Sequence, residues 1–345
     1  MKKFFLLALI IFGLGVYHSQ AQTADEISAI ADGPKILVLN YHQIDNKSNP
    51  LSVTPADFDT QMKFLVDSGC ITITPDELYA GINGDITLPP KPVLITFDDG
   101  YIDNYTFVLP VLEEYGLQGT FFIPGKTFTT HQLLDVNKIH YIMASADIGK
   151  LLPDVFERLD HYRGRQFDYA SNEELFVKYA VPSRYDSREI RFVKGVLQAA
   201  LPEEARNRIS SDLFEKHVGI SEEKLAWELY MNPDQLMTLK RHGMFIGVHG
   251  YDHYWLDVLP EDELQADIDK ALEIMDPFID RNAWAMAYPY GRYSQAVLDQ
   301  IASRGACVGV TIEPRTAVIG RDNPLTLPRL DCNDFPPKSE NYKEH

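Results

Sequence analysis

Cysteine is scarce in this chain: Cys70, Cys307 and Cys332 are the only three among 345 residues. Their spacing matches no zinc motif, which excludes a structural zinc site built from cysteines. Two of them could pair if the protein is exported. Because the three fall in strand-like segments, however, we predict buried free thiols.

Positive charge is scarce too. The chain has 32 Lys and Arg residues against 50 Asp and Glu residues, and its formal net charge is −18. A protein this acidic is repelled by nucleic acid and by anionic lipid surfaces. The charge balance therefore excludes nucleic acid as a partner and favours a neutral or cationic one.

Long hydrophobic runs are missing except near the N-terminus. Residues 4–16 are almost all apolar, follow two lysines, and precede Ser19 and Ala21, small residues suited to cleavage after Ala21. The run has the length of a signal-peptide core and is short for a membrane span. We predict a signal peptide at residues 1–21, export to the periplasm or the cell exterior, and no stable membrane insertion after cleavage. An uncleaved membrane anchor is the alternative.

Two common hydrolase signatures are also absent. The chain contains no G-x-S-x-G nucleophile elbow, and no cysteine lies near a histidine in a pattern typical of a catalytic triad. The sequence therefore gives no indication of serine or cysteine nucleophiles.

Strand-like and helix-like segments alternate along most of the chain. The expected strands cover residues 35–40, 71–73, 93–97, 119–123, 245–248, 284–287 and 306–312. Helices are expected between them, one of them opened by a capping box at residues 74–77. Repeated strand-then-helix units indicate a parallel sheet. We predict an α/β fold, a distorted (β/α) barrel of about seven strands, within a domain spanning residues 33–335.

The strand pattern fades between residues 126 and 230. This stretch is polar, charged and mostly helix-like, as in residues 189–201. We interpret residues 126–230 as a helical insertion between two barrel strands. A small separate domain would show a similar pattern and stays open.

Two acidic residues follow one of the expected strands. Asp98 and Asp99 come directly after residues 93–97, and Gly100 lets the chain turn sharply there. Adjacent carboxylates are costly to bring together unless something positive lies beside them. Functional side chains of α/β barrels sit at the carboxyl ends of strands. The acid pair is therefore a candidate site, although Asp-Asp-Gly also occurs in solvated turns.

Two histidines follow another expected strand. His249 and His253 are four residues apart, directly after residues 245–248, with Gly250 between them. With Asp99 they make a set of two histidines and one carboxylate with open positions, suited to catalytic zinc or a similar divalent ion. Two unrelated loop histidines are the alternative.

The motifs occur together in a recognisable order: TFDDG at residues 96–100, the H-x-x-x-H pair, and a Tyr-Pro-Tyr-Gly turn at residues 288–291. Together they resemble the polysaccharide deacetylase family, which has the NodB-type fold and forms carbohydrate esterase family 4. Residues 39–42 (Leu-Asn-Tyr-His) are similar to an N-terminal signature of the poly-N-acetylglucosamine deacetylase branch. The resemblance covers residues 35–122 and 232–330 and leaves the predicted insertion outside it.

The resemblance implies a role for each matching residue. Asp98 would be the general base, Asp99, His249 and His253 the metal ligands, and the backbone N–H of Tyr290 a donor to the oxyanion. The implied reaction removes N-acetyl groups from an acetylated polysaccharide or glycan. A divalent metal, for which Zn²⁺ is the leading candidate, would polarise the acetyl carbonyl. The base would take the proton of the attacking water.

The chain departs from the family pattern at three points. The Ser or Thr that usually follows the first histidine is Gly250, so a loop hydrogen bond is missing. The usual Arg near the third motif is absent, and Arg329 is a candidate substitute that would orient Asp98. The usual C-terminal Leu-x-His acid is absent too. His42, at the end of the first strand, is the candidate acid, and a buried structural histidine is the alternative.

These departures leave three functions open. The leading one is N-acetyl hydrolysis, the second is an O-acetyl esterase acting on glycans, and the third is a non-catalytic glycan-binding protein with a retained metal site. The missing motifs favour the third function, whereas the intact Asp98 and Asp99 pair and both histidines oppose it.

Aromatic residues cluster near the expected ligands in sequence. We predict that a neutral sugar lies in a groove lined by Tyr251, Tyr254, Trp255 and Tyr290, because sugar faces pack on such rings.

Overall fold

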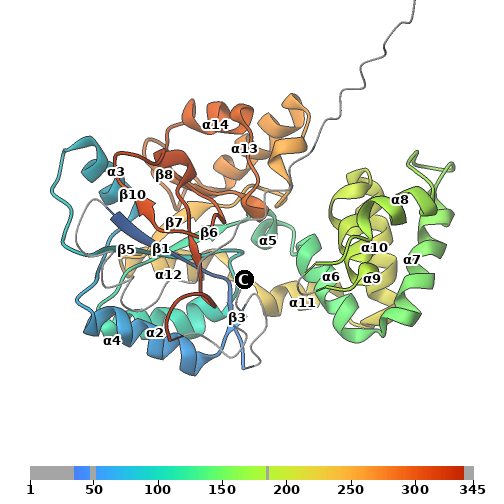
Figure 1. Ribbon diagram of the computed structural model, residues 1–345, viewed down its shortest axis with the longest axis horizontal. Coiled ribbons are helices and arrows are strands. Elements are labelled where there is room, and N and C mark those ends of the chain that lie inside the picture. Colours follow the sequence, from blue (N-terminus) through green and yellow to red (C-terminus); the bar gives the residue numbers. More distant parts are fainter. Residues whose placement is uncertain (1–34, 47–51, 184–185, 338–345) are drawn as a thin grey trace, which may run out of the picture.

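The computed structural model describes residues 35–46, 52–183 and 186–337. The predicted signal peptide, residues 1–21, lies outside the described residues. Within the described part, no helix combines the length and the apolar character needed to cross a membrane. Figure 1 shows a larger body, built around a sheet, beside a smaller bundle of helices.

One curled, nine-stranded sheet organises the larger body. Its order is β10-β1-β5-β6-β7-β8-β9, with β11 beside β1 and β4 beside β5, and β1, β5, β6, β7, β8 and β9 run parallel. A separate pair is formed by β2 and β3. The half-barrel confirms the predicted fold, and a strand lies at each of the seven expected places. The strands are β1 (Lys35–Tyr41), β2 (Gln43–Ile44), β3 (Ser52–Val53), β4 (Ile71–Thr72), β5 (Pro92–Phe97), β6 (Gly119–Ile123), β7 (Phe245–Val248), β8 (Trp284–Ala287), β9 (Ala306–Val310), β10 (Ala317–Val318) and β11 (Leu330–Asp331).

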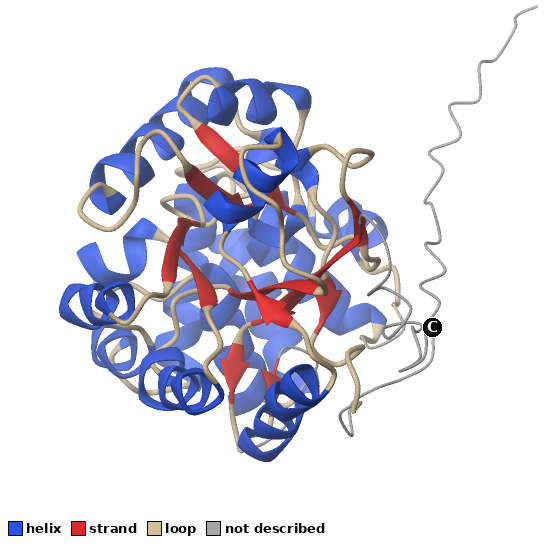
Figure 2. Cartoon of the chain, turned by 90° about the vertical axis from the view of Figure 1, so that its left-hand side faces the viewer, coloured by secondary structure: helices blue, strands red, loops and turns tan. Residues whose placement is uncertain are grey.

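Helices surround the strands of the larger body (Figure 2) and make up the bundle. Between β6 and β7 the described chain forms α5 to α12, and α5 to α11 cover the range where we predicted a helical insertion. The α-helices are α2 (Pro55–Asp67), α3 (Pro75–Asn83), α4 (Leu109–Tyr115), α5 (Gly125–Thr129), α6 (Asp135–Ser145), α7 (Ile148–Tyr162), α8 (Asn172–Tyr179), α9 (Arg188–Gly195), α10 (Glu203–His217), α11 (Glu222–Leu229), α12 (Pro233–Arg241), α13 (Glu261–Met275) and α14 (Gln295–Ala302). Shorter turns are the π-helices η1 (Asn104–Val108) and η2 (Val196–Ala200) and the 3₁₀ helices η3 (Leu256–Val258), η4 (Pro289–Gly291) and η5 (Pro324–Thr326).

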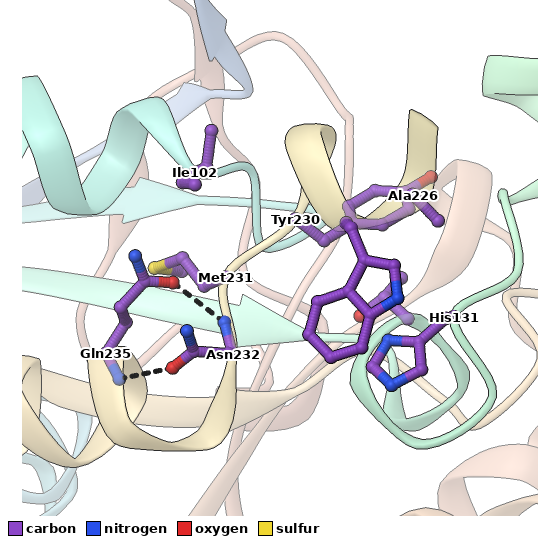
Figure 3. Close-up of a pocket in the computed structure, with 9 residues that line it drawn as sticks. Ile102, His131, Ala226, Tyr230, Met231, Asn232 and Gln235 are labelled. Carbon is purple, nitrogen blue, oxygen red and sulfur yellow. Dashed lines mark hydrogen bonds between the residues drawn. The ribbon is translucent and has the colours of Figure 1, made fainter. Parts of the chain in front are cut away.

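Local sequence patterns set the starts of several helices. The predicted capping box of α3 is present at Thr74 and Glu77. A second box opens α12, where the backbone N–H groups of Asn232 and Gln235 each donate to the other side chain, at 2.8 and 3.0 Å (Figure 3). Such boxes satisfy backbone donors that have no partner inside the helix.

The two bodies have separate apolar clusters. The sheet body packs around fully buried rings such as Phe97 and Phe121, which stack with their centroids 4.8 Å apart. The bundle packs around residues such as Phe192 and Leu213. The three cysteines are unpaired as predicted, although Cys70 is partly exposed rather than buried.

A short segment links the two edges of the curled sheet. Leu327 bridges to Val310 at the end of β9, and four residues later Asp331 pairs with Asn40 of β1. Arg329 lies between these two attachments. The segment therefore brings Arg329 to the mouth of the half-barrel, where the parallel strands β5 and β7 also end.

Candidate active site

The acid pair lies at the carboxyl end of β5, inside the molecule. Asp98 and Asp99 are 2% and 4% exposed. Asp99 has φ of 72° and Gly100 has φ of 71°, so the chain turns through two consecutive left-handed residues. A left-handed conformation is uncommon for aspartate and persists where the surrounding structure enforces it, which is typical of functional sites. The turn directs neighbouring carboxylates to different partners.

Asp99, His249 and His253 form the one described group of side chains that could hold a metal ion. Their candidate ligand atoms all lie within 4.8 Å of one another. The Nε2 atoms of His249 and His253 are 3.5 and 3.3 Å from Asp99 Oδ1. His249 Nδ1 lies 2.7 Å from the carbonyl oxygen of Ala287, so Nδ1 carries the proton and Nε2 is left as a ligand atom.

The buried atoms of this group fit a cation. Asp99 Oδ1 and His253 Nδ1 are shielded from solvent, and neither has a hydrogen-bond partner among the described residues. Burial raises the pKa of Asp99, but the neighbouring His249 and His253 outweigh it and hold that pKa well below the usual value. The aspartate is thus ionised, and two histidines with one carboxylate are a donor set that suits zinc and related ions.

Asp98 contacts Arg329 rather than the histidine pair. The two guanidinium Nη atoms donate to the two carboxylate oxygens, at 2.9 and 2.7 Å, and Nε donates to the carbonyl of Thr311 at 2.7 Å. Burial raises the pKa of Asp98, but the nearby Arg329 and His249 lower it by more than burial raises it. The pKa of Asp98 is therefore below the usual value. The geometry keeps Asp98 ionised and fixed in orientation.

His42 lies beside Asp98. Its Nε2 is 4.0 Å from Asp98 Oδ2, and His42 is not part of the metal-capable group. Asp331, which the sequence patterns did not single out, lines the same cavity. Burial raises the pKa of Asp331, and His42 acts in the opposite direction. An acidic residue therefore lies within electrostatic reach of the candidate acid.

All these groups open into one cavity of about 370 Å³ at the mouth of the half-barrel. A cavity of this size suits a small ligand such as a sugar unit. Every predicted catalytic and metal-binding residue lines it. The lining residues are Asn40, His42, Asp98, Asp99, Val136, His249, His253, Tyr288, Tyr290, Gly291, Ile312, Pro314, Arg329 and Asp331.

A sequence model of one family, described as polysaccharide deacetylase, matches residues 85–160 and 212–308, which is half of the chain. The chain belongs to the polysaccharide deacetylase family. The match includes residues 126–160 and 212–230, which we had placed outside the resemblance. Only residues 161–211 of the predicted insertion fall in the gap between the matched segments.

Individual deacetylases are more distant. YxkH of Bacillus subtilis, assigned to the polysaccharide deacetylases, is 24% identical over 283 residues, which cover 82% of this chain and 66% of YxkH. The poly-beta-1,6-N-acetyl-D-glucosamine N-deacetylase of Escherichia coli K12 is 26% identical over 126 residues, or 33% of this chain. This chain thus spans just under two thirds of YxkH, and 19% of the E. coli enzyme.

A solved structure shares the fold. The deacetylase PplD of Streptococcus pyogenes, solved with acetate, has a TM-score of 0.54 and 20% identity to this chain. The similarity covers 86% of this chain and 92% of PplD. The half-barrel architecture is therefore that of a known deacetylase.

The aromatic groove predicted from the sequence is only partly present. Tyr290, at a left-handed φ of 58°, lines the cavity, and its ring lies 4.7 Å from the ring of His253. Trp255 packs beside Tyr290, with ring centroids 5.8 Å apart. Tyr251, however, is buried under Lys270, so our expectation that it lines the groove was wrong. Its side chain belongs to the apolar core, and its hydroxyl lies 3.3 Å from the hydroxyl of Thr129.

The family's missing loop hydrogen bond is replaced from a distant helix. Asp267 of α13 accepts hydrogen bonds from the backbone N–H groups of Tyr251 and Asp252, at 3.0 and 2.9 Å. A β-carbon on Gly250, whose φ is 70°, would lie 3.1 Å from Asp267 Oδ1. The glycine leaves room for this carboxylate, and the carboxylate holds the loop that carries His253.

Replacing Asp267 by Asn is expected to destabilise the protein at pH 7 by about 1–3 kcal/mol, because the amide keeps only one of the two oxygens that accept from the loop N–H groups. The cost should depend on pH. Burial raises the pKa of Asp267 to about 6, whereas an aspartate in an unfolded chain titrates near ~3.9. As pH falls, Asp267 is therefore protonated in the folded protein before it is protonated in the unfolded chain. The free energy of unfolding rises as pH falls from about 6 to about 4.

Denaturant unfolding of the wild-type and Asp267→Asn proteins between pH 7 and pH 4 measures this effect. We expect the wild-type advantage in free energy of unfolding to grow as pH falls. A difference that stays constant over this range would contradict the assignment, because all other carboxylates cancel in the comparison.

Proposed function

We propose that this chain is a metal-dependent hydrolase that removes N-acetyl groups from an amino-sugar polysaccharide or glycan. The observation that carries the proposal is the arrangement around Asp98: a buried, ionised carboxylate held by Arg329, directly beside the group formed by Asp99, His249 and His253. A protein that only bound glycans would have no need of this second, oriented carboxylate.

Each residue has a task in the proposed reaction. Asp99, His249 and His253 would hold a divalent cation, which we propose to be Zn²⁺, and it would supply Lewis-acid chemistry at the acetyl carbonyl and the attacking water. Asp98 takes the proton of that water as general base, and Arg329 keeps the carboxylate ionised and aligned. The backbone N–H of Tyr290 donates to the developing oxyanion.

His42 completes the proposal as general acid. It lines the same cavity as Asp98, and its side chain is partly exposed, at 18%. The amine leaves far more readily when its nitrogen is protonated, so a second group that can donate a proton is needed.

We further propose that the substrate is a neutral polymer outside the cytoplasm. The net charge of −18 repels acidic polysaccharides, and the predicted signal peptide at residues 1–21 directs export. The domain would span residues 33–335, with the helices of residues 126–230 as its insertion.

Acetate release and metal content together test the proposed function. Purified protein, loaded in turn with zinc, cobalt, nickel or iron, is incubated with neutral N-acetylglucosamine oligomers, O-acetylated glycans and acidic polysaccharides. We expect acetate and free amine from the N-acetylated oligomers, in proportion to bound metal. Acetate without amine would favour the O-acetyl esterase, and tight binding without acetate would favour the glycan-binding protein.

Replacing His42 by Asn is expected to slow amide hydrolysis by about a hundredfold or more, the usual effect of removing a general acid. Hydrolysis of an activated acetyl ester should fall much less, because a good leaving group needs no proton. Rates are measured on N-acetylglucosamine oligomers and on 4-nitrophenyl acetate with metal-loaded protein.

His242→Asn is the matched control, since His242 is exposed and paired with Glu113 away from the cavity. It should leave both rates unchanged. Equal losses on amide and ester substrates in His42→Asn would refute the acid role.

A further inference from the structure

One wall of the catalytic cavity comes from the helical insertion. Among the described residues lining the cavity, Val136 is the one that belongs to residues 126–230. It lies in the first turn of α6. Figure 1 shows α6 on the side of the bundle that is nearest the sheet. The insertion thus reaches the reaction centre with an apolar side chain.

A buried hydrogen-bond network fixes α6 against the acid pair. Asn137, adjacent to Val136, donates from Nδ2 to the hydroxyl of Tyr101 at 2.6 Å. Its Oδ1 accepts from the hydroxyl of Tyr230, which in turn accepts from the backbone N–H of Leu134 at 3.0 Å. Tyr101, Asn137 and Tyr230 are 5%, 5% and 3% exposed. A fully satisfied buried network of this kind specifies one arrangement.

The backbone makes a second attachment at the same place. Tyr101 and Tyr230 form an antiparallel bridge, in which Ile102 N–H donates to Leu229 at 2.8 Å and Met231 N–H donates to Gly100 at 2.9 Å. Figure 3 shows Tyr230 and Met231 between the insertion and the start of α12. The chain leaving the insertion is therefore bonded to the residues that directly follow Asp99.

The insertion also touches the other ligand loop. Lys126, 6% exposed, forms an ion pair with Asp252 at 3.2 Å. Tyr254 donates to the side chain of Glu203 at the start of α10. Both loops that carry metal-capable residues are thus in contact with the insertion.

Other residues of α6 act on the same centre. His140, one turn after Val136, is a mostly buried histidine whose pKa falls to about 4 because of burial and the nearby Lys194, and Asp99 and His42 also act on it. Asp135 is among the charges that raise the pKa of Tyr290, after the larger effect of burial. The charges of α6 and of the site therefore act on one another, and Val136 is the described residue of α6 that lines the cavity.

We propose that α6 is the substrate-selecting wall of the deacetylase, with Val136 as the specificity-determining contact and Asn137 as the residue that positions it. The inference rests on the proposed function and deepens it. With Ile312, Pro314 and Tyr290, Val136 makes the cavity largely apolar around a polar floor. This chemistry suits one acetylated hexosamine ring that packs its C–H face on Val136 and carries no bulky substituent on that face.

Two substitutions of Val136 test the wall, one smaller and one larger. Val136→Ala removes contact with the ring, and Val136→Phe fills the space that the ring needs. Either change should lower kcat/KM for N-acetylglucosamine oligomers by about tenfold, the usual effect of small shape changes in a binding pocket. The loss should lie in KM, and hydrolysis of 4-nitrophenyl acetate, which does not reach the wall, should fall less.

Two further variants separate recognition from folding. Val177→Phe is the matched control, because Val177 of α8 is 74% exposed in the same insertion and should tolerate the change. Tyr101→Phe removes the acceptor of Asn137 and should raise KM for the oligomers in the same way as Val136→Ala. Because both act through α6, the double variant Tyr101→Phe with Val136→Ala should lose less than the product of the two single effects.

Binding without turnover keeps this inference distinct from the proposed function. The dissociation constant of the oligomer is measured by calorimetry on zinc-loaded Asp98→Asn protein, with and without Val136→Phe. We expect Val136→Phe to weaken binding about tenfold. An unchanged dissociation constant overturns the proposal that Val136 contacts the substrate, even if the wild-type protein is an active deacetylase. A weakened constant together with an inactive wild-type protein supports the wall and overturns the proposed function.

Discussion

Replacing Asp98 by Asn is expected to lower kcat by at least about a hundredfold while the protein keeps its bound metal, because removal of a general base typically has this effect. The substitution is nearly isosteric and leaves Asp99, His249 and His253 unchanged. The amide can still accept one hydrogen bond from Arg329 but cannot take a proton from water. Turnover per bound metal ion on N-acetylglucosamine oligomers measures the effect.

Folding must be separated from chemistry in this experiment. Asp98→Asn leaves the guanidinium of Arg329 buried, at 1% exposed, without its counter-charge. Breaking a buried pair on one side is strongly destabilising, by about 3–5 kcal/mol. The double variant Asp98→Asn with Arg329→Gln removes both charges and should recover much of this stability without recovering activity. Near wild-type turnover in either variant would rule out Asp98 as the base.

Replacing His249 by Ala is expected to abolish both metal binding and acetate release. In the proposed site His249 is one of three protein ligands, and the group that could hold a metal contains only Asp99 and His253 besides it among the described residues. Metal content after dialysis, measured by elemental analysis, should fall from one ion per chain towards zero. Unchanged metal stoichiometry in His249→Ala would refute the ligand assignment.

Stability provides a second readout that does not depend on activity. A ligand that binds only the folded state stabilises it by about 4 kcal/mol at a thousandfold excess over its dissociation constant. Zinc should therefore raise the melting temperature of the wild-type protein and leave that of His249→Ala unchanged. His161→Ala, in α7 of the insertion, is the matched control and should respond to zinc like the wild-type protein.

The sequence determined the elements of the half-barrel and the end at which the site lies. Strands such as β6 and β7 are short apolar runs bounded by turns, and helices such as α3 begin at capping boxes, so both are encoded by neighbouring residues. Because parallel strands end at one edge of a sheet, the residues that follow β5, β7 and β8 had to meet there. The motifs at Asp98, His249 and Tyr290 were therefore readable in the chain.

The sequence also contained a pattern around Asp267 that we did not use. Asp267 falls among Leu264, Ile268 and Ala271 on the buried face of α13. A carboxylate on an apolar helix face needs a partner, since an unpaired buried charge is costly. This pattern predicts a hydrogen-bonded acid, but it does not say that the partners are the N–H groups of the ligand loop.

Tertiary structure alone decided which distant side chains touch. The sequence offered Arg329 as a candidate partner of Asp98, but the two residues are 231 positions apart and meet because the segment after β9 crosses to β1. Val136 reaches the cavity because two buried tyrosines, Tyr101 and Tyr230, fix α6 there. Tyr251 sits close to His253 in sequence but points into the core. Local patterns set the backbone, whereas side-chain direction and long-range contacts depend on how the packed elements fill space.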